Sequence, residues 1–178
     1  MKSIIFSTKM IEAIFYKNKT QTRRIMKPQP IFDPAGQTFT RPRKTIYAIG
    51  DVIWVRETFR RALDEKIRQI DYKAQIPDTL FGLKSNNNYE IDLIKWSRWI
   101  PSIHMPENIA RLFLRVVDLK AERIQDISTE NAKSEGFENK EQFCAYWDEL
   151  YSLGVYSWDQ NPWVWIVEFK LIDPPETT

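Results

Sequence analysis

Hydrophobic positions recur along this chain with two periods, and each period predicts a different kind of element. Apolar residues at the spacing of one helix face predict a short helix near the start, at Met10, Ile11, Ile14 and Phe15. Apolar runs or alternation predict strands over 4–6, 52–55, 110–119 and 163–172. Two later helices are predicted over 128–135 and 141–151; Ser128 is a suitable N-cap of the first, and Gly136 a suitable end. Helices and strands are therefore mixed along the chain.

Long stretches between these elements lack either period. The segment after Arg24 contains prolines at 28, 30, 34 and 42, which favour loop over strand. Residues 60–95 carry scattered charges and three consecutive asparagines at 86–88. We interpret them as an insertion that contains one short hairpin, formed by 71–74 and 89–93.

Composition narrows the class of protein. A chain of 178 residues with 43% hydrophobic residues fits one domain with a real core. A formal net charge of +2 is too small for a general polyanion binder, so any nucleic-acid contact must be a local patch. The single cysteine, Cys144, excludes an internal disulfide and fits a reducing cytoplasm. No apolar run reaches the roughly 18 residues of a membrane span. We therefore expect a soluble cytoplasmic protein without a membrane partner. One histidine and one cysteine leave too few of the usual ligands for zinc, and we expect neither metal nor cofactor.

The most distinctive polar stretch is 19–24, with sequence Lys-Thr-Gln-Thr-Arg-Arg, directly after the first helix. Its threonines and the following Ile25 favour an extended chain. In a strand, Thr22 and Arg24 point to one face and Arg23 to the other. Lys19, at the corner before the strand, can extend over the face of Thr22, so that an ammonium, a hydroxyl and a guanidinium converge. The alternative is an ordinary solvated strand start.

Glu135 occupies an unfavourable place for a carboxylate. In the last turn of a helix it faces the negative end of the macrodipole, at a cost of roughly 0.3–1 kcal/mol. A nearby cation would remove the conflict, and Lys19 or Arg24 can supply it. An exposed glutamate that tolerates the small cost is the alternative.

His104 is the only histidine, and it lies between two prolines, Pro101 and Pro106. Two prolines that bracket four residues favour an extended loop of fixed shape. We expect this loop to form a wall of the site through His104 or Ser102, although a purely structural histidine is the alternative.

Four motifs in order resemble the ASCH domain of the PUA-like superfamily. They are Lys19-Thr20-x-Thr22-x-Arg24 after a short helix, Gly50-Asp51-Val52 before a strand, the helix 128–136 with Glu135 near its end, and the closing strand 163–169. The stretches 55–58, 101–106 and 161–163 extend the likeness to longer ASCH proteins encoded by bacteriophages and prophages. The resemblance thus covers nearly the whole chain.

The resemblance implies an α+β fold with a PUA-like mixed β-barrel and flanking helices. It implies a single domain over 1–178, with insertions at about 26–46, 60–106 and 137–162, and a cleft that faces RNA or a modified nucleoside. The best-defined bacterial members are hydrolases that deacetylate N-acetylcytidine. Their catalytic residues correspond to Lys19 as base, Thr22 as nucleophile and Glu135 as proton shuttle. Lys19 can act as a base only if its pKa lies well below about 10.4.

Ligand contacts are expected around this triad. Arg24 and Arg56 are candidate contacts for an anion or a carbonyl, and a base can stack on Trp54, Trp96 or Trp99. Glu57 and His104 complete the expected ligand-binding residues. The alternatives are a non-catalytic RNA-binding module, a ribonuclease, or a phage accessory protein. In the last case the aromatic-rich stretch 137–165 would bind a protein partner.

Overall fold

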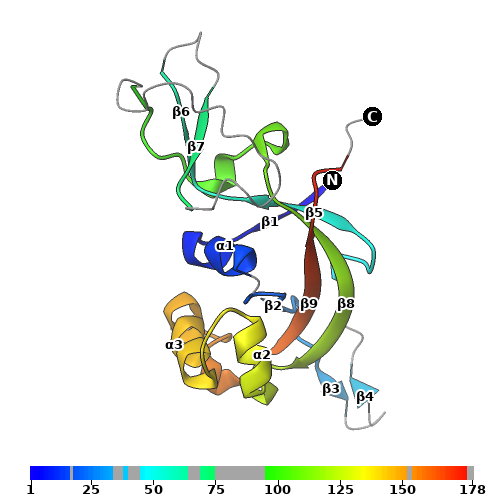
Figure 1. Ribbon diagram of the computed structural model, residues 1–178. Coiled ribbons are helices and arrows are strands. Elements are labelled where there is room, and N and C mark those ends of the chain that lie inside the picture. Colours follow the sequence, from blue (N-terminus) through cyan, green and yellow to red (C-terminus); the bar gives the residue numbers. More distant parts are fainter. Residues whose placement is uncertain are drawn as a thin grey trace. The chain divides into compact units, whose positions relative to one another are not determined.

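A five-stranded mixed sheet is the largest element of the structure, a computed structural model that describes residues 1–16, 18–33, 38–39, 45–63, 69–74, 95–151 and 154–175 (Figure 1). The strand order is β1-β5-β8-β9-β2. The strands span Lys2–Ile5, Val52–Arg56, Phe113–Arg123, Trp163–Ile172 and Gln21–Ile25, in that order.

The chain divides into two compact units that alternate along the sequence. Unit 1 comprises Met1–Tyr16, Val52–Leu114 and Leu171–Thr178, and unit 2 comprises Lys17–Asp51 and Arg115–Lys170. Each unit has its own cluster of buried apolar side chains. We describe the units separately.

Unit 1 begins with β1, which runs parallel to β5 with Ser3 opposite Trp54. Helix α1 (Thr8–Phe15) follows, and the Ser7 side chain caps it by accepting a hydrogen bond from the Met10 amide at 3.4 Å. The four apolar residues predicted to form one face of this helix are all buried. Periodicity therefore located this helix correctly.

A small antiparallel sheet extends unit 1. Strand β6 (Phe59–Arg61) pairs with β7 (Ile70–Tyr72). Two further backbone bridges join Phe59 to Ile100 and Ala62 to Trp96. The unit also contains two 3₁₀ turns, η2 (Ser102–His104) and η3 (Glu107–Ile109). Its buried cluster contains Trp54, Phe59, Met105 and Phe113.

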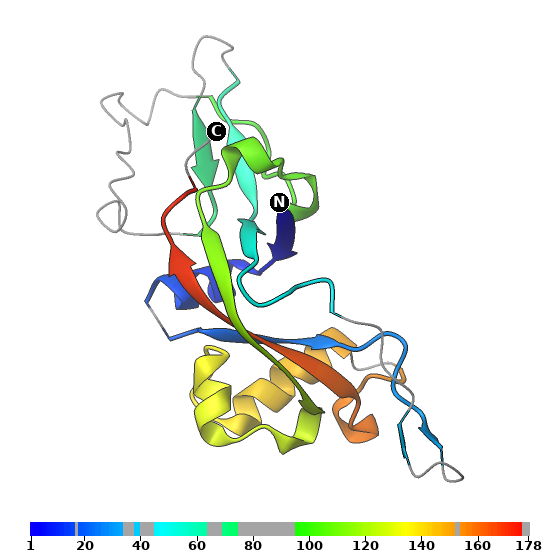
Figure 2. The ribbon, with the colours of Figure 1, turned by 90° about the vertical axis from the view of Figure 1, so that its right-hand side faces the viewer.

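Unit 2 contains β2 and most of β8 and β9, which are neighbours in the sheet, together with two helices. Strand β2 pairs with β9, and α2 (Thr129–Ser134) and α3 (Lys140–Tyr151) lie beside these strands (Figures 1 and 2). The strand pair β3 (Phe32–Asp33) and β4 (Thr38–Phe39) and the turns η4 (Ile124–Asp126) and η5 (Trp158–Gln160) complete the unit. Its core contains Ile124, Ile127, Ala132, Phe143, Trp147 and Val164. The aromatic residues of 137–165 that join or contact this core are therefore used in packing.

The α+β class is confirmed, but the described strands do not form the predicted closed barrel. The sheet is open, with β1 and β2 as its two outer strands. In unit 2, the end of α2 lies along the chain that leads into β2. The Thr20 amide donates to the Ser134 carbonyl at 2.8 Å, and a backbone bridge joins Lys19 to Glu135. The residues directly before β2 therefore pair with the end of a helix.

The hairpin predicted within 60–95 has a different partner strand in the structure. Residues 70–72 pair with 59–61, and 89–93, which we expected to pair with 71–74, lie outside the described residues. The insertions at 26–46 and 60–106 are likewise described only in part, whereas 137–162 contains α3 and η5.

Candidate functional site

The centre of the candidate site is a buried ion pair between Lys19 and Glu135 in unit 2. Lys19 Nζ donates to Glu135 Oε2 at 2.7 Å and to the Glu135 carbonyl at 2.9 Å. A third hydrogen bond goes to the Gln21 carbonyl at 2.9 Å. The two side chains are only 1% and 4% exposed. An ammonium has three donors, so each can be matched with an acceptor of the protein.

Arg23 joins the same pair from β2. Its Nη1 donates to Glu135 Oε1 at 3.1 Å, so the Glu135 carboxylate has a cation on each oxygen. The Arg23 Nε and Nη2 atoms donate to Glu122 at 2.8 and 2.6 Å. Two cations and two carboxylates thus balance in one network, which reduces the high cost of burying each charge alone.

The local sequence explains why Glu135 points into this network. Ser128 caps α2 by accepting from the Asn131 amide at 3.1 Å, as predicted. Glu135 is the C-cap, and Gly136 follows with a φ of 91°, in the left-handed region that favours glycine. Gln21 Nε2 donates to the Asn131 carbonyl at 2.7 Å, which ties β2 to the same helix.

Burial lowers the pKa of Lys19 from its usual value of 10.5, because the charged form loses its hydration. The Glu135 carboxylate opposes this effect, while the nearby charges of Arg24 and Arg23 add to it. A lysine that acts as a base needs a lowered pKa, and the pKa of Lys19 is shifted in that direction. In the arrangement seen here, however, Nζ donates to three acceptors, as a protonated ammonium does.

Thr22 and Arg24 lie on the other face of β2 from Arg23, as strand alternation predicts. Thr22 pairs with Val167 and is only 5% exposed. Among the hydrogen bonds of the described residues, none joins the Thr22 hydroxyl to Lys19 or Glu135. Arg24 is half-buried, and its charge acts on Tyr47 and on Lys19. The structure therefore brings Lys19 and Glu135 into contact, but without a hydrogen bond to Thr22.

An open groove of about 670 Å³ lies directly beside the ion pair. Its walls come from the neighbours of the paired residues, Asn18 and Thr20 on one side and Ser134 and Gly136 on the other. Helix α3 and the turn before it supply the rest of the lining. The complete lining is Asn18, Thr20, Lys133, Ser134, Gly136, Phe137, Glu138 and Gln142.

Trp54, Arg56 and His104 belong to unit 1. The Trp54 side chain is 6% exposed and packs in the core, with the Arg56 guanidinium 5.4 Å from its ring centroid. Arg56 Nη2 donates to the Ile103 carbonyl, so this side chain contacts the proline-bracketed loop. His104 is exposed at the end of η2. Lys19 lies in unit 2, so the expected wall of one shared site stays a prediction.

Glu57, also in unit 1, is fully buried and forms a two-pronged ion pair with Arg111. Arg111 donates to the two carboxylate oxygens at 2.9 and 2.7 Å, and its guanidinium lies 4.1 Å from the Tyr72 ring centroid. Burial raises the pKa of Glu57, against the effect of Arg111. Burial and the nearby Glu57 charge raise the pKa of Tyr72 to about 12. Glu57 is 0% exposed, and the ligand contact expected of it stays a prediction.

Sequence reasoning missed Arg23, Glu122 and Arg111 as members of these networks. Strand alternation placed Arg23 opposite Thr22, which suggested a role away from the site. Glu122 and Arg111 lie 99 and 54 residues from their partners. No local pattern in the sequence connects residues so far apart.

The described residues hold no group of three or more His, Cys, Asp or Glu side chains that could bind a metal ion. No described helix is long and apolar enough to cross a membrane.

Comparison with known proteins adds one distant structural likeness. No family model matches the sequence, and no curated protein matches it. The crystal structure of protein EF3133 from Enterococcus faecalis V583, a DUF984 protein, is similar with a TM-score of 0.45 and 10% identity, over 100% of this chain and 85% of that chain. We draw no functional conclusion from a likeness at this level.

Proposed function

We propose that this chain is a nucleoside- or RNA-binding protein of the ASCH type, and that it binds its ligand in the groove beside the Lys19–Glu135 pair. The observation that carries the proposal is the position of this groove. Its two walls belong to the backbone segments that the buried ion network joins, so the groove has a fixed frame. A volume of about 670 Å³ is in the usual range for small-molecule sites.

The lining supplies the contacts that a nucleoside needs. Phe137 is half-buried and offers part of a ring for stacking against a base. Asn18 and Gln142 carry amide groups that can pair with the polar edge of a base, and Thr20 offers a hydroxyl. Lys133 is exposed and can contact a phosphate or a carbonyl.

Binding experiments with cytidine and N-acetylcytidine test this proposal. Thr20→Ala and Lys133→Ala should each weaken binding roughly 2- to 10-fold, as expected for the loss of one hydrogen bond. The matched control is Lys9→Ala, an exposed lysine of α1 in unit 1. Equal affinities of all three variants and the parent protein would remove the groove as the binding site.

Hydrolysis of an N-acyl group is the second candidate function, and the lowered pKa of Lys19 favours it. The 2.7 Å contact lets the Lys19 proton move to Glu135 Oε2, which leaves a neutral amine. In this mechanism the amine accepts the Thr22 hydroxyl proton as the oxygen attacks the acyl carbonyl. The leaving amine of the nucleoside then receives a proton from Glu135, and the acyl group remains on the Thr22 oxygen as an ester. A water molecule cleaves this ester in a second step, which releases the carboxylic acid and restores the Thr22 hydroxyl. The ligand must bring Thr22 and Lys19 into hydrogen-bond reach, since catalytic contacts often form only in the complex.

Incubation with a panel of acylated and unmodified nucleosides, followed by mass spectrometry, tests the hydrolysis. Thr22→Val keeps the side-chain shape but removes the hydroxyl, and it should abolish turnover while ligand binding survives. Thr22→Ser should retain part of the turnover.

Lys19→Arg keeps the charge but cannot act as a base, and it should lower turnover by roughly 10²- to 10⁴-fold. Full turnover in either Thr22→Val or Lys19→Arg would contradict the mechanism. Absence of turnover on every substrate, with binding intact, would leave the binding function alone.

A further inference from the structure

A stack of one arginine and two tryptophans lies on the small sheet of unit 1, outside the groove. The Arg60 guanidinium carbon is 4.8 Å from the Trp96 ring centroid and 4.7 Å from the Trp99 ring centroid. Asp71 holds the same guanidinium through a 2.7 Å hydrogen bond to Arg60 Nε. Such stacking of guanidinium on indole is favourable, and the aspartate fixes its orientation.

The register of this sheet places the stack on its outer face. Phe59 pairs with Ile100, and Ala62 with Trp96, and paired residues share a face. Phe59 is 1% exposed and packs into the core of the unit. Alternation then turns Arg60 and Ala62 away from the core, together with Trp96. Trp99, which contacts Arg60, is 40% exposed.

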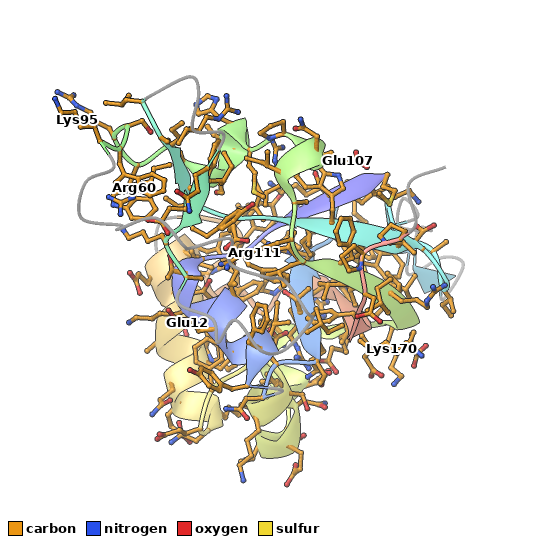
Figure 3. The ribbon with its side chains drawn as sticks, turned by 45° about the horizontal axis from the view of Figure 1, so that its top comes forward. Glu12, Arg60, Lys95, Glu107, Arg111 and Lys170 are labelled. Carbon is orange, nitrogen blue, oxygen red and sulfur yellow. The ribbon has the colours of Figure 1, made fainter. Side chains whose placement is uncertain are left out.

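Cations are frequent in the described segments next to this stack. Residues 59–63, 69–74 and 95–100 carry five cations and one acid. The acid is Asp71, which already pairs with Arg60. Figure 3 shows Arg60 and Lys95 at the same end of the unit. The remaining four cations are exposed: Arg61, Lys73, Lys95 and Arg98.

We propose that this surface, formed by Trp96, Arg60, Trp99 and the surrounding cations, binds single-stranded nucleic acid. An exposed indole held by an arginine is a stacking platform for an unpaired base, and the cations match the phosphate backbone. Arg60 stacks on the Trp99 ring, and Asp71 holds Arg60 in place. Trp99 therefore loses little side-chain freedom when a base stacks on it. A duplex offers no unstacked base and gains only the charge contacts.

This inference rests on the proposed nucleic-acid function and extends it from a single nucleoside to a strand. Its site lies in unit 1, whereas the groove lies in unit 2. The two proposals can therefore fail separately.

Fluorescence anisotropy with labelled oligouridylate, oligothymidylate and a duplex of equal length tests the surface. The protein should bind one or both single strands more tightly than the duplex, and the two strands distinguish RNA from DNA. Trp99→Ala should weaken single-strand binding roughly 5- to 150-fold, and Trp99→Phe should restore most of it. Tyr16→Ala, which removes an aromatic residue that is 63% exposed at the end of α1, should leave binding unchanged.

Three results would overturn the inference. They are failure of both single strands to bind, equal effects of Trp99→Ala and Tyr16→Ala, and equal affinity for the duplex. The first would leave the exposed indole as a surface for another class of partner, such as a protein. Circular dichroism on each variant checks that the fold is retained.

Nucleoside binding and turnover, measured on the same variants, separate the two proposals. Trp99→Ala should keep both, because the groove is unaltered. Loss of strand binding alone supports the platform. Strand binding that depends on Trp99 without any nucleoside binding would contradict the groove but not the platform.

Discussion

In the described part of the chain, the buried charged residues fall into two networks with different compositions. In unit 2, Lys19 and Arg23 balance Glu135 and Glu122, and the Lys19 and Glu135 side chains are almost fully enclosed. In unit 1, Glu57 pairs with Arg111, and Tyr72 lies against the guanidinium. Buried pairs are strongly destabilising when broken, even where their net contribution to folding is small.

The first prediction concerns the pair at the centre of the site. Lys19→Met and Glu135→Gln should each lower the free energy of unfolding by about 3–5 kcal/mol, since each leaves the buried network with one uncompensated charge. The double variant should lose less than the sum, by roughly 0.5–3 kcal/mol. Denaturant titration of the three variants measures this coupling. Lys9→Met, at an exposed position, should change stability by less than about 0.5 kcal/mol, and additive losses would show that the pair is not coupled.

Tyr72 provides a prediction for alkaline pH. Its pKa is raised to about 12, while an unfolded tyrosine titrates near 10. Between these values the unfolded chain has lost the proton that the folded chain keeps, so stability from this group falls as pH rises through the window. Ultraviolet difference spectra of the parent protein against Tyr72→Phe should show one tyrosine ionising near pH 12. An ionisation near pH 10 would contradict the burial of this hydroxyl.

Among the elements, α2 carries most of the candidate site. It has only six residues, yet its C-cap is Glu135, its Asn131 carbonyl accepts from Gln21, and its last turn lines the groove. A helix this short depends on its caps and on packing rather than on intrinsic propensity. The geometry of the site is therefore sensitive to the end of this helix.

Gly136 tests that sensitivity. Its φ of 91° is costly for residues with a Cβ, so Gly136→Ala should lower the free energy of unfolding by about 1–2 kcal/mol. Gly136→Asn should cost less, because asparagine tolerates the left-handed region better. Thermal and denaturant unfolding of both variants measure the difference. Equal stability of the alanine variant and the parent protein would mean that the helix can end without this conformation.

At the scale of the whole molecule, the formal net charge of the complete chain is only +2. The described part of the small sheet in unit 1 and its neighbouring segment nevertheless carries four exposed cations, Arg61, Lys73, Lys95 and Arg98. Composition alone argued against general polyanion binding and for a local patch. The proposed strand-binding surface is such a patch.

The salt dependence of strand binding follows from this local charge. If about four phosphates are neutralised, the slope of log K against log salt should be about −3 for a single strand. Lys95→Ala should reduce the magnitude of the slope by about 0.7, and Lys9→Ala should leave it unchanged. Anisotropy titrations at several salt concentrations give both values. A slope near zero would exclude phosphate contacts at this surface.

Local sequence patterns determined most of the elements. The helix face at 10–15, a helix over 141–151, the capped helix that ends at Gly136, and the strands at 52–55 and 163–172 were all predictable. Each depends on residues within a few positions of one another, where periodicity and capping act. The inward face of the helix over 141–151 was predicted less well, because Leu150 is 51% exposed. A cation beside Glu135 was also predictable, because a carboxylate at a helix C-terminus favours one, and Lys19 was one of the two candidates.

Only the tertiary structure decided which face of each strand is enclosed and by what. Alternation placed Arg23 opposite Thr22, but the packing of α2 on that face made Arg23, rather than Arg24, the second partner of Glu135. The open sheet and the stack of Arg60 on two tryptophans likewise depend on segments that meet across many residues. Strand periodicity fixes the direction of a side chain within its own strand. What lies in that direction is decided by long-range packing, which no local pattern encodes.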